Sequence, residues 1–325
     1  MATSAGIQHG DAVEPEGPVL AGIDGGGSRT RVAVTIAGQQ VASLEIGTVR
    51  IGAVGIGEAC ERLVNALVEL REQTGVIGYD AVVAGIAGVW LPEERQRVEQ
   101  VLRWMARERR LLLGELRVVS DAEIALEGAL AGKPGVVLIA GTGTIAVGRT
   151  PSGQLVRCGG WGIELDDEGS GAWIGREGLT AVVRALDGRG QPTCLAQKLA
   201  ELYPSIRLEQ PRTIVAAYNE RLFEYPTLTP LVMACAQEGD AVCRAILERA
   251  AAHLVELLLP LRRHFPRRPI PLSLLGGMLE NHTLLARLFR EQLAGVPDYR
   301  LQAPKGTSLD GAFALADRLL SEKEP

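Results

Sequence analysis

The chain has 325 residues, of which 46% are hydrophobic, 22% charged and 4% aromatic. This composition excludes a disordered or fibrous protein, and the length allows two domains that each bury a core. The 34 Lys and Arg against 39 Asp and Glu give a net charge of −5, and no basic run is long enough to follow a nucleic-acid backbone. We therefore expect no nucleic acid partner.

Residues 1–18 are small and polar, and they lack the basic flank and apolar centre of a signal peptide. We expect them to form a disordered leader. Nowhere is there a run of about 18 uncharged apolar residues, so we expect no membrane partner and a cytoplasmic protein. The five cysteines are scattered and never spaced C-x-x-C, which predicts neither a disulfide framework nor a zinc site.

The first half of the chain alternates strands and helices. Residues 19–41 predict an apolar strand, a glycine-rich turn, a second strand, a turn and a third strand. Apolar residues at helical spacing then predict helices at 58–73 and 93–107, with a buried strand at 81–88 between them. This alternation is typical of a layered α/β domain.

The second half opens by repeating the first. Residues 136–156 again contain an apolar strand, a glycine and threonine turn and a second strand, which predicts two duplicated halves. The remainder is more helical: the longest periodic run is 241–263, a strand is expected at 270–277, and helices at 280–293 and 309–320.

The first glycine-rich turn indicates phosphate binding of an unusual kind. A strand rather than a helix follows it, and Gly-Lys-Ser/Thr is absent, so neither a Rossmann nor a Walker site is predicted. The backbone N–H groups of the hairpin would bind phosphate themselves, and the aspartate at the strand end could hold Mg²⁺. An ordinary turn aspartate is the alternative. The residues concerned are Asp24, Gly25, Gly26, Gly27, Ser28 and Thr30.

The second turn has the same design, with threonine hydroxyls as further donors. It consists of Gly141, Thr142, Gly143 and Thr144. Alone, either turn could be an ordinary hairpin. As a pair in duplicated halves, they could hold one nucleoside triphosphate from both sides of a cleft.

With these motifs the sequence resembles the actin-like, sugar-kinase and Hsp70-like ATPase superfamily, and within it the BadF/BadG/BcrA/BcrD group that includes N-acetylglucosamine kinases. The resemblance covers residues 19 to about 320 and implies an α/β fold of two duplicated actin-like ATPase (ribonuclease H-like) domains with a cleft between them. It implies an N-terminal domain of residues 19–132 plus 308–325 and a C-terminal domain of residues 133–307. ATP and Mg²⁺ are the implied cofactors, and we expect a homodimer.

The resemblance also implies roles for single motifs. Asp24 to Thr30 match a first phosphate motif, Gly141 to Thr144 a second, and Gly276 with Gly277 end an adenosine motif. Small residues in two segments predict helices that approach closely at a domain junction, which is the hinge in the family. These residues are Ala125, Gly128 and Ala129 in one segment and Gly311, Ala312 and Ala316 in the other.

Asp121 is implied to be the general base that takes a proton from the attacking sugar hydroxyl. A carboxylate within hydrogen-bond distance aligns such a hydroxyl and removes its proton late in the reaction. The alternative is structural: Ser120 and Glu123 form an S-x-x-E capping box, which places Asp121 at the first position of a helix, where its charge favours the helix dipole.

Residues 159–175 resemble the run through which N-acetylglucosamine kinases bind their amino sugar. By that match Gly160, Trp161 and Asp167 contact the sugar, an aspartate accepting hydrogen bonds from hydroxyls and a tryptophan offering an apolar face. The alternative makes Trp161 a core aromatic and Asp166 to Glu168 a solvated start to a helix near Ser170.

Two residues expected near the sugar differ from the family pattern. Arg50 stands near the position of an asparagine that reaches the sugar, and Asp166 replaces a glycine. Asp166 could favour a free amine and Arg50 a lactyl carboxylate. The leading hypothesis is therefore an ATP-dependent kinase for the 6-hydroxyl of N-acetylglucosamine, with glucosamine and N-acetylmuramic acid as alternatives.

An alternative of another class is an ATPase that activates a 2-hydroxyacyl-CoA dehydratase or a benzoyl-CoA reductase, as relatives in the same family do. Those activators carry an iron–sulfur cluster at a dimer interface. The cysteines here show no recognisable cluster pattern.

Overall fold

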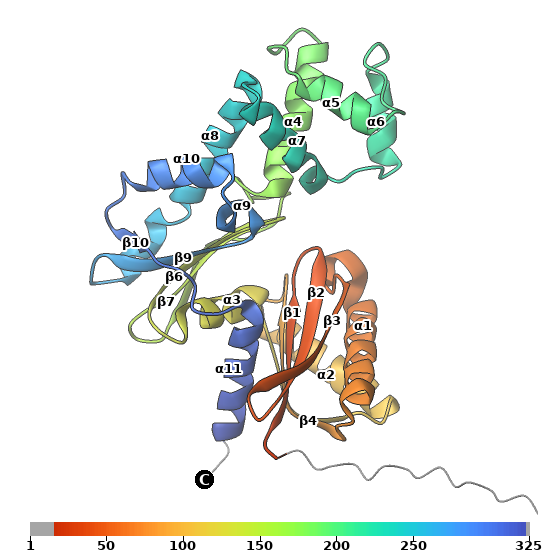
Figure 1. Cartoon of the computed structure of the whole chain (residues 1–325), viewed down its shortest axis with the longest axis vertical. Coiled ribbons are helices and arrows are strands. Elements are labelled where there is room, and N and C mark those ends of the chain that lie inside the picture. The colour runs from red at the N-terminus through yellow and green to blue at the C-terminus, as the bar shows by residue number, and fades with distance from the viewer. Residues whose placement is uncertain (1–15, 323–325) are drawn as a thin grey trace, which may run out of the picture. The chain divides into compact units, whose positions relative to one another are not determined.

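The computed structural model describes residues 16–322 and contains two compact units (Figure 1). Among these residues, unit 1 comprises 16–128 and 306–322, and unit 2 comprises 129–305. The expected leader lies outside the described residues, apart from residues 16–18.

Unit 1 is built on a five-stranded mixed sheet with the order β3-β2-β1-β4-β5. The first three strands form the predicted antiparallel meander, and β4 and β5 run parallel to β1. Its strands are β1 (Val19–Gly25), β2 (Arg29–Ile36), β3 (Gln39–Gly47), β4 (Gly78–Ile86) and β5 (Leu112–Val119).

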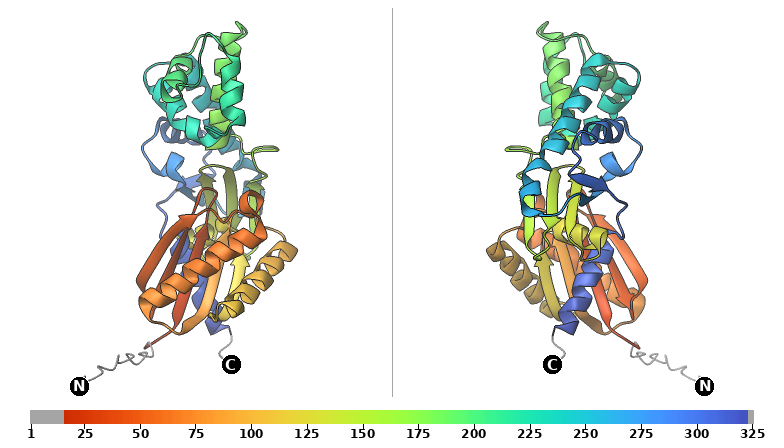
Figure 2. Two further views of the ribbon diagram at one scale, coloured as in Figure 1. Left: turned by 90° about the vertical axis from the view of Figure 1, so that its right-hand side faces the viewer. Right: turned by 90° about the vertical axis from the view of Figure 1, so that its left-hand side faces the viewer.

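Helices cover both faces of this sheet (Figures 1 and 2). Because side chains of a strand alternate between faces, Ala21 and Ile23 of β1 join the core beneath α1 and α2, whereas Leu20 packs with α3 and α11. The predicted helices are confirmed, although α1 begins earlier, across a kink at Gly55. The helices are α1 (Ile51–Thr74), α2 (Pro92–Glu108), α3 (Asp121–Leu130) and α11 (Ser308–Ser321).

The backbones of α3 and α11 lie in direct contact. A Cβ atom at Gly128 would collide with the Thr307 carbonyl, and one at Gly311 with the Ile124 carbonyl. The close approach predicted from the small residues is confirmed. Beside it, the carboxylate of Glu127, which is 2% exposed, pairs with Arg318 at 2.7 Å.

The sheet of unit 2 repeats the topology of unit 1. Its order is β10-β9-β6-β7-β8, again an antiparallel meander whose first strand pairs in parallel with a later strand. The outermost pair, β9 and β10, is also parallel. The strands are β6 (Gly135–Ala140), β7 (Thr144–Arg149), β8 (Leu155–Gly159), β9 (Ile270–Leu275) and β10 (Tyr299–Leu301).

The rest of unit 2 is helical, and two boundaries differ from the sequence prediction. The run 241–263 is not one helix: α8 ends at Glu256 and a 3₁₀ helix follows, in which Pro260 cannot donate a helical N–H. The helix expected at 280–293 begins at Leu284, because the Thr283 hydroxyl caps it by accepting from the Ala286 N–H at 3.0 Å. The helices are α4 (Gly171–Leu186), α5 (Leu195–Leu202), α6 (Arg212–Asn219), α7 (Tyr225–Gln237), α8 (Ala241–Glu256), η1 (Leu259–His264), α9 (Gly277–Glu280) and α10 (Leu284–Leu293).

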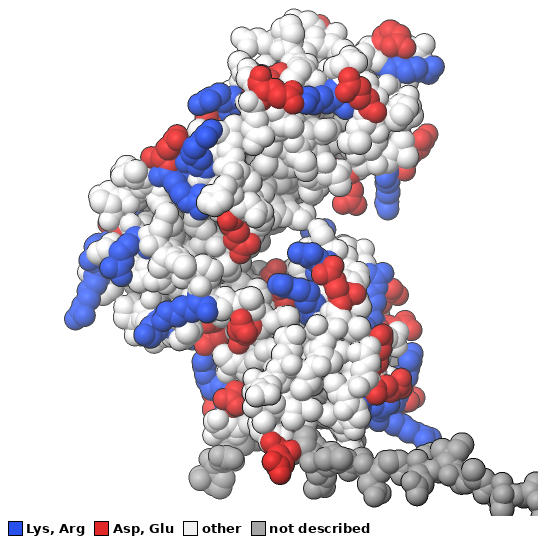
Figure 3. Space-filling view, in the orientation of Figure 1, with Lys and Arg blue, Asp and Glu red and all other residues white. Residues whose placement is uncertain are grey.

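Charges of both signs are interspersed over the face shown in Figure 3. Within residues 16–322 no helix is both long enough and apolar enough to span a membrane.

Candidate active site

The first glycine turn is a tight connection between β1 and β2. The Gly26 N–H donates to the Arg29 carbonyl at 3.1 Å, and the Gly25 carbonyl accepts from the Ala87 N–H at 2.8 Å. Gly25 must lack a side chain, since a Cβ there would lie 2.6 Å from Val49 Cγ2. The turn is therefore anchored to the neighbouring loop.

Asp24, at the end of β1, lies on the face of the sheet that carries α3 and α11. Gly22, two residues earlier, packs against Phe313 of α11, and strand side chains repeat every second residue. The cross-strand partner of Asp24 is Arg31, whose Nη2 lies 2.6 Å from Asp24 Oδ2. This ion pair was not predicted from the sequence, although the period-two spacing of a tight hairpin places the two residues opposite each other.

The residues of the first turn fit a magnesium ion. Arg31 occupies only one oxygen of Asp24, and Mg²⁺ in phosphate sites is held by one or two carboxylates, with phosphate oxygens and water completing its shell. The hydroxyl of Thr30 is not available to this ion: Thr30 is fully buried and, by the alternation along β2, lies with Val32 and Val34 on the face opposite to Asp24.

Asp121 begins α3, and its neighbours form the capping box that the sequence predicts. The Ser120 N–H donates to Glu123 Oε2 at 2.9 Å, and the Glu123 N–H donates to Ser120 Oγ at 3.2 Å. The carboxylate of Asp121 takes no part in this box and accepts from the Ala122 N–H at 2.9 Å. The cap therefore does not require Asp121.

The environment of Asp121 raises its pKa to about 6. Desolvation is the main cause, and the negative charges of Asp24 and Glu123 act in the same direction, while the hydrogen bond from the Ala122 N–H opposes them. A carboxylate of this kind is ionised at neutral pH and yet more basic than an ordinary aspartate. Those are the properties that a general base requires.

The second glycine turn is fixed by the start of α4. The Gly171 and Ala172 N–H groups donate to the carbonyls of Gly141 and Thr142 at 2.9 and 3.1 Å. Ser170, predicted to lie near the helix start, caps α4 by accepting from the Trp173 N–H at 3.0 Å. The first helical amides thus orient the turn through its carbonyls.

Asp167 lies against this second turn. Its side chain is 8% exposed, and its Oδ1 accepts from the Thr144 N–H at 3.1 Å. A Cβ at Gly143 would lie 2.9 Å from Asp167 Oδ2, and the backbone φ of Asp167 is 63°, a strained value for a residue with a side chain. The alternative of a solvated helix start is therefore wrong for Asp167.

Trp161 is an exposed ring rather than a core aromatic. Its side chain is 63% exposed, and the Arg157 guanidinium lies 4.1 Å from the ring centroid. The backbone N–H of Trp161 donates to Asp166 Oδ2 at 3.3 Å. Gly160 precedes it with a φ of 77°, a conformation that favours glycine. An apolar ring beside a carboxylate and exposed backbone suits a neutral polar ring as ligand.

Two further predicted residues lie beside the turns. Arg50 is exposed at the start of α1, and the Thr48 hydroxyl links it to the first turn, accepting from the Arg50 N–H at 3.1 Å and donating to the Gly26 carbonyl at 3.0 Å. In unit 2, a side chain at Gly276 would collide with the carbonyl of Ala140, the residue before the second turn. Gly277 begins α9 directly after it.

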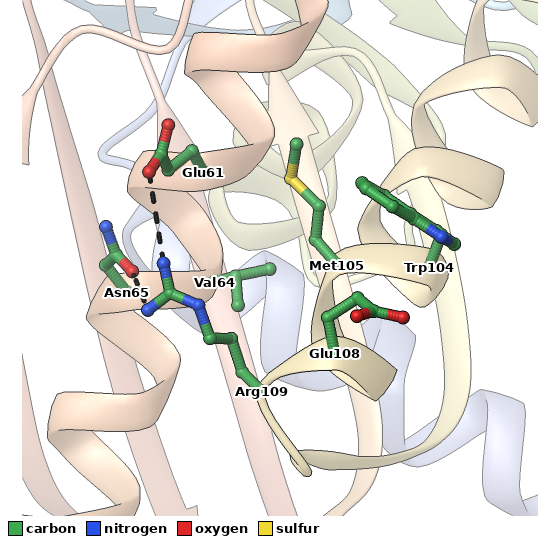
Figure 4. Close-up of a pocket in the computed structure, with 7 residues that line it drawn as sticks. All are labelled: Glu61, Val64, Asn65, Trp104, Met105, Glu108 and Arg109. Atoms are coloured by element: carbon green, nitrogen blue, oxygen red, sulfur yellow. Dashed lines mark hydrogen bonds and ion pairs between the residues drawn. The ribbon is translucent and has the colours of Figure 1, made fainter.

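A hollow of about 220 Å³ lies elsewhere in unit 1, between α1 and α2 (Figure 4). Arg109 on its rim donates to Asn65 Oδ1 at 2.9 Å. The residues predicted for nucleotide or sugar binding do not line it. Its lining consists of Glu61, Val64, Asn65, Trp104, Met105, Glu108 and Arg109.

Three cysteines that are far apart in the sequence gather around Asp240 in unit 2. The Cys194 and Cys243 N–H groups each donate to the Asp240 carboxylate at 2.8 Å, and Cys235 adjoins Cys194. Burial raises the pKa of the Cys235 thiol to about 11 and those of Cys194 and Cys243 to about 12.

The chain belongs to the BadF/BadG/BcrA/BcrD ATPase family, whose sequence profile matches residues 21–311. The resemblance inferred from the motifs is thereby confirmed, as is the α/β fold class. The chain is 30% identical over 310 residues to an N-acetylmuramic acid/N-acetylglucosamine kinase of Clostridium acetobutylicum, and the alignment covers 91% of this chain and 97% of the relative. It is also 30% identical to the N-acetyl-D-glucosamine kinase of Dictyostelium discoideum, covering 94% of this chain and 99% of that protein.

The structure is also similar to a solved one. A Chromobacterium violaceum protein, provisionally assigned as an N-acetylglucosamine kinase, superposes with a TM-score of 0.73 at 27% identity. The similarity covers 93% of this chain and 100% of that protein.

Proposed function

We propose that this protein is an ATP-dependent amino-sugar kinase that transfers the γ-phosphate of ATP to the 6-hydroxyl of N-acetylglucosamine, with Asp121 as the general base. The observation that carries the proposal is the state of Asp121: a carboxylate with a raised pKa, not required by the cap of its own helix, on the face of the sheet where Asp24 lies. The kinases among its relatives support the substrate class.

The two glycine turns are the proposed phosphate-binding elements. In each, the backbone is fixed through its carbonyls or through a neighbouring loop. Backbone N–H groups and the hydroxyls of Ser28, Thr142 and Thr144 are the kinds of donor that suit phosphate oxygens. Asp24 would hold Mg²⁺, which when bound neutralises charge on the phosphates. Gly276 and Gly277 would lie against the adenosine.

The loop from Gly160 to Asp167 is the proposed sugar site. The Trp161 ring would pack on the sugar, and Asp166 and Asp167 would accept from its hydroxyls or amine. Arg50 is a candidate for a carboxylate substituent. Glucosamine and N-acetylmuramic acid therefore remain the alternative substrates within this function.

In the proposed phosphate transfer, the main task of the protein is to position the sugar hydroxyl and the γ-phosphate. Asp121 accepts a hydrogen bond from the sugar hydroxyl, aligns its oxygen with the γ-phosphorus and takes the proton as the new P–O bond forms. The bond between the γ-phosphorus and the bridging oxygen breaks, and ADP leaves with that electron pair. Arg31, paired with Asp24, balances negative charge beside the first turn.

An ADP-release assay over a sugar panel tests this function. N-acetylglucosamine should stimulate ADP release above the sugar-free rate, with glucosamine and N-acetylmuramic acid as the comparison sugars. The Asp121→Asn variant should lose about 10²-fold to 10⁴-fold in kcat while its affinity for ATP is retained. Asp317→Asn, on the exposed side of α11, is the matched control and should leave kcat unchanged. If none of the three sugars stimulates ADP release, the kinase proposal is wrong.

A further inference from the structure

An arginine on a neighbouring helix clamps the helix that begins with Asp121. Arg95 lies near the start of α2, and its Nη2 is 2.7 Å from Glu123 Oε2, while its Nη1 donates to Glu123 Oε1 at 3.3 Å. Both side chains are largely buried, with 24% and 12% exposed. Two parallel bonds between a guanidinium and a carboxylate fix orientation as well as distance.

Glu123 in turn binds Ser120, the residue before Asp121. The oxygen that faces Arg95 Nη2 also accepts from the Ser120 N–H at 2.9 Å and from the Ser120 hydroxyl at 3.1 Å. Arg95 therefore holds Glu123, and Glu123 holds Ser120. Asp121 lies between Ser120 and Glu123 in the chain, so the direction of its carboxylate depends on both neighbours.

The distribution of charge gives a second reason to single out Arg95. Three carboxylates interact here: Asp24 and Glu123 each raise the pKa of Asp121. Asp24 has its own arginine in Arg31, and Glu123 has Arg95. Asp121 forms no ion pair within residues 16–322, so the two arginines balance its neighbours and leave its own carboxylate available.

Arg95 also has a feature that lowers the stability of the fold. Its Nε is buried and has no hydrogen-bond partner in the described part of the chain. A donor left in this way opposes folding, and a buried ion pair is often no more stable than apolar residues of the same volume. The Arg95–Glu123 pair is therefore not explained by a gain in stability.

We propose that Arg95 is a positioning residue for Asp121: by clamping Glu123 it fixes the first turn of α3 and so the direction of the Asp121 carboxylate toward the substrate hydroxyl. The inference rests on the proposed function, in which Asp121 is the general base.

Steady-state kinetics of Arg95→Gln test the proposal. Because misdirection of a base impairs the chemical step, kcat for the sugar should fall about 10-fold to 10²-fold, with KM for sugar and for ATP unchanged. Arg95→Lys, which keeps the charge but not the paired bonds, should recover part of the loss. Arg103→Gln is the control on the same helix: its guanidinium binds the Gly114 carbonyl at 3.0 Å and should leave kcat unchanged. Equal loss of kcat in Arg95→Gln and Arg103→Gln would overturn the proposal.

A double-mutant cycle separates positioning from general damage. In an Asp121→Asn background Arg95→Gln should cause no further loss of kcat, because there is no base left to misdirect. The same fold-loss in both backgrounds would show that Arg95 acts independently of Asp121 and would contradict the proposal.

Amide hydrogen exchange gives a readout that does not depend on activity. Arg95→Gln should speed exchange in the peptide that spans Ser120 and Ile124, while exchange in α11 should not change. If the wild-type protein shows no sugar-dependent ADP release, the kinase function fails, and the clamp is then judged by exchange alone. Unchanged exchange in that peptide would overturn the clamp itself.

Discussion

Asp24 and Asp121 are coupled across the α3 face of the first sheet: the charge of one raises the pKa of the other. Asp24 ends β1, and Asp121 begins the helix that packs against the same face, so the topology brings together two carboxylates nearly a hundred positions apart in the chain. Together with desolvation, which is the largest cause, this charge gives Asp121 a pKa of about 6, from which two predictions follow directly.

The kcat/KM for the sugar should depend on pH with an acid limb near pH 6, because a pKa of about 6 belongs to the protein without bound sugar. Below that value Asp121 is protonated and cannot accept a proton, so kcat/KM should fall about tenfold for each further pH unit. The measurement is kcat/KM for the sugar from pH 5 to pH 9 at saturating ATP. A profile that stays flat between pH 5 and pH 7 would contradict the role of Asp121.

Asp121→Asn should increase stability even as it abolishes activity. The pKa of Asp121 is raised on folding, so its stabilising contribution is complete only below the unfolded pKa and is lost as pH rises through about 6. Above pH 6 the ionised carboxylate costs on the order of 3 kcal/mol at most, which the variant removes. Urea denaturation at pH 8 and pH 4 measures this: we expect a gain at pH 8 and little at pH 4. Equal stability of the two proteins at pH 8 would argue against desolvation of Asp121.

The Trp161→Ala variant should raise the KM for the sugar with little loss of stability. Its ring is 63% exposed, so removal costs little packing, whereas loss of a stacked ring should weaken sugar binding by about 5-fold to 20-fold. Trp104→Ala is a matched control, because that tryptophan is 59% exposed and lines the hollow between α1 and α2 (Figure 4). An equal rise in KM in both variants would refute a specific role for Trp161.

The Gly311→Ala variant should be strongly destabilised. The added Cβ would collide with the Ile124 carbonyl, and relieving the overlap requires α3 and α11 to separate, at a cost of about 1–3 kcal/mol or more. Gly57→Ala in α1 is the control: no atom lies within 4 Å of its added Cβ, so the variant should be neutral or slightly stabilised. Thermal unfolding of the two variants measures the difference, and similar Tm values would contradict the contact.

The sequence predicts local features of this fold well because their causes are local. The meander at residues 19–41 follows from alternation along each strand, and the capping box of Ser120 and Glu123 follows from two residues three positions apart. The break after α8 is also local, and Pro260 within the apolar run signals it.

Apart from the close approach of α3 and α11, the interactions between distant segments were not predicted. The clamp of Arg95 on Glu123 and the burial of Asp167 against Thr144 depend on where helices and loops meet in space. No spacing within the chain encodes these distances. The sequence therefore indicates the residues proposed to do the chemistry more readily than those that hold them in place.

The return of α11 to unit 1 affects the order in which the protein folds during synthesis. Leu20, Ala81 and Val83 are made early, yet their apolar partners Ala312, Ala316 and Leu319 belong to the last helix. All of unit 2 leaves the ribosome before these partners do. The part of the sheet face that α11 covers therefore stays exposed in the nascent chain until all of unit 2 has been synthesised, although α3 is already available to cover the rest.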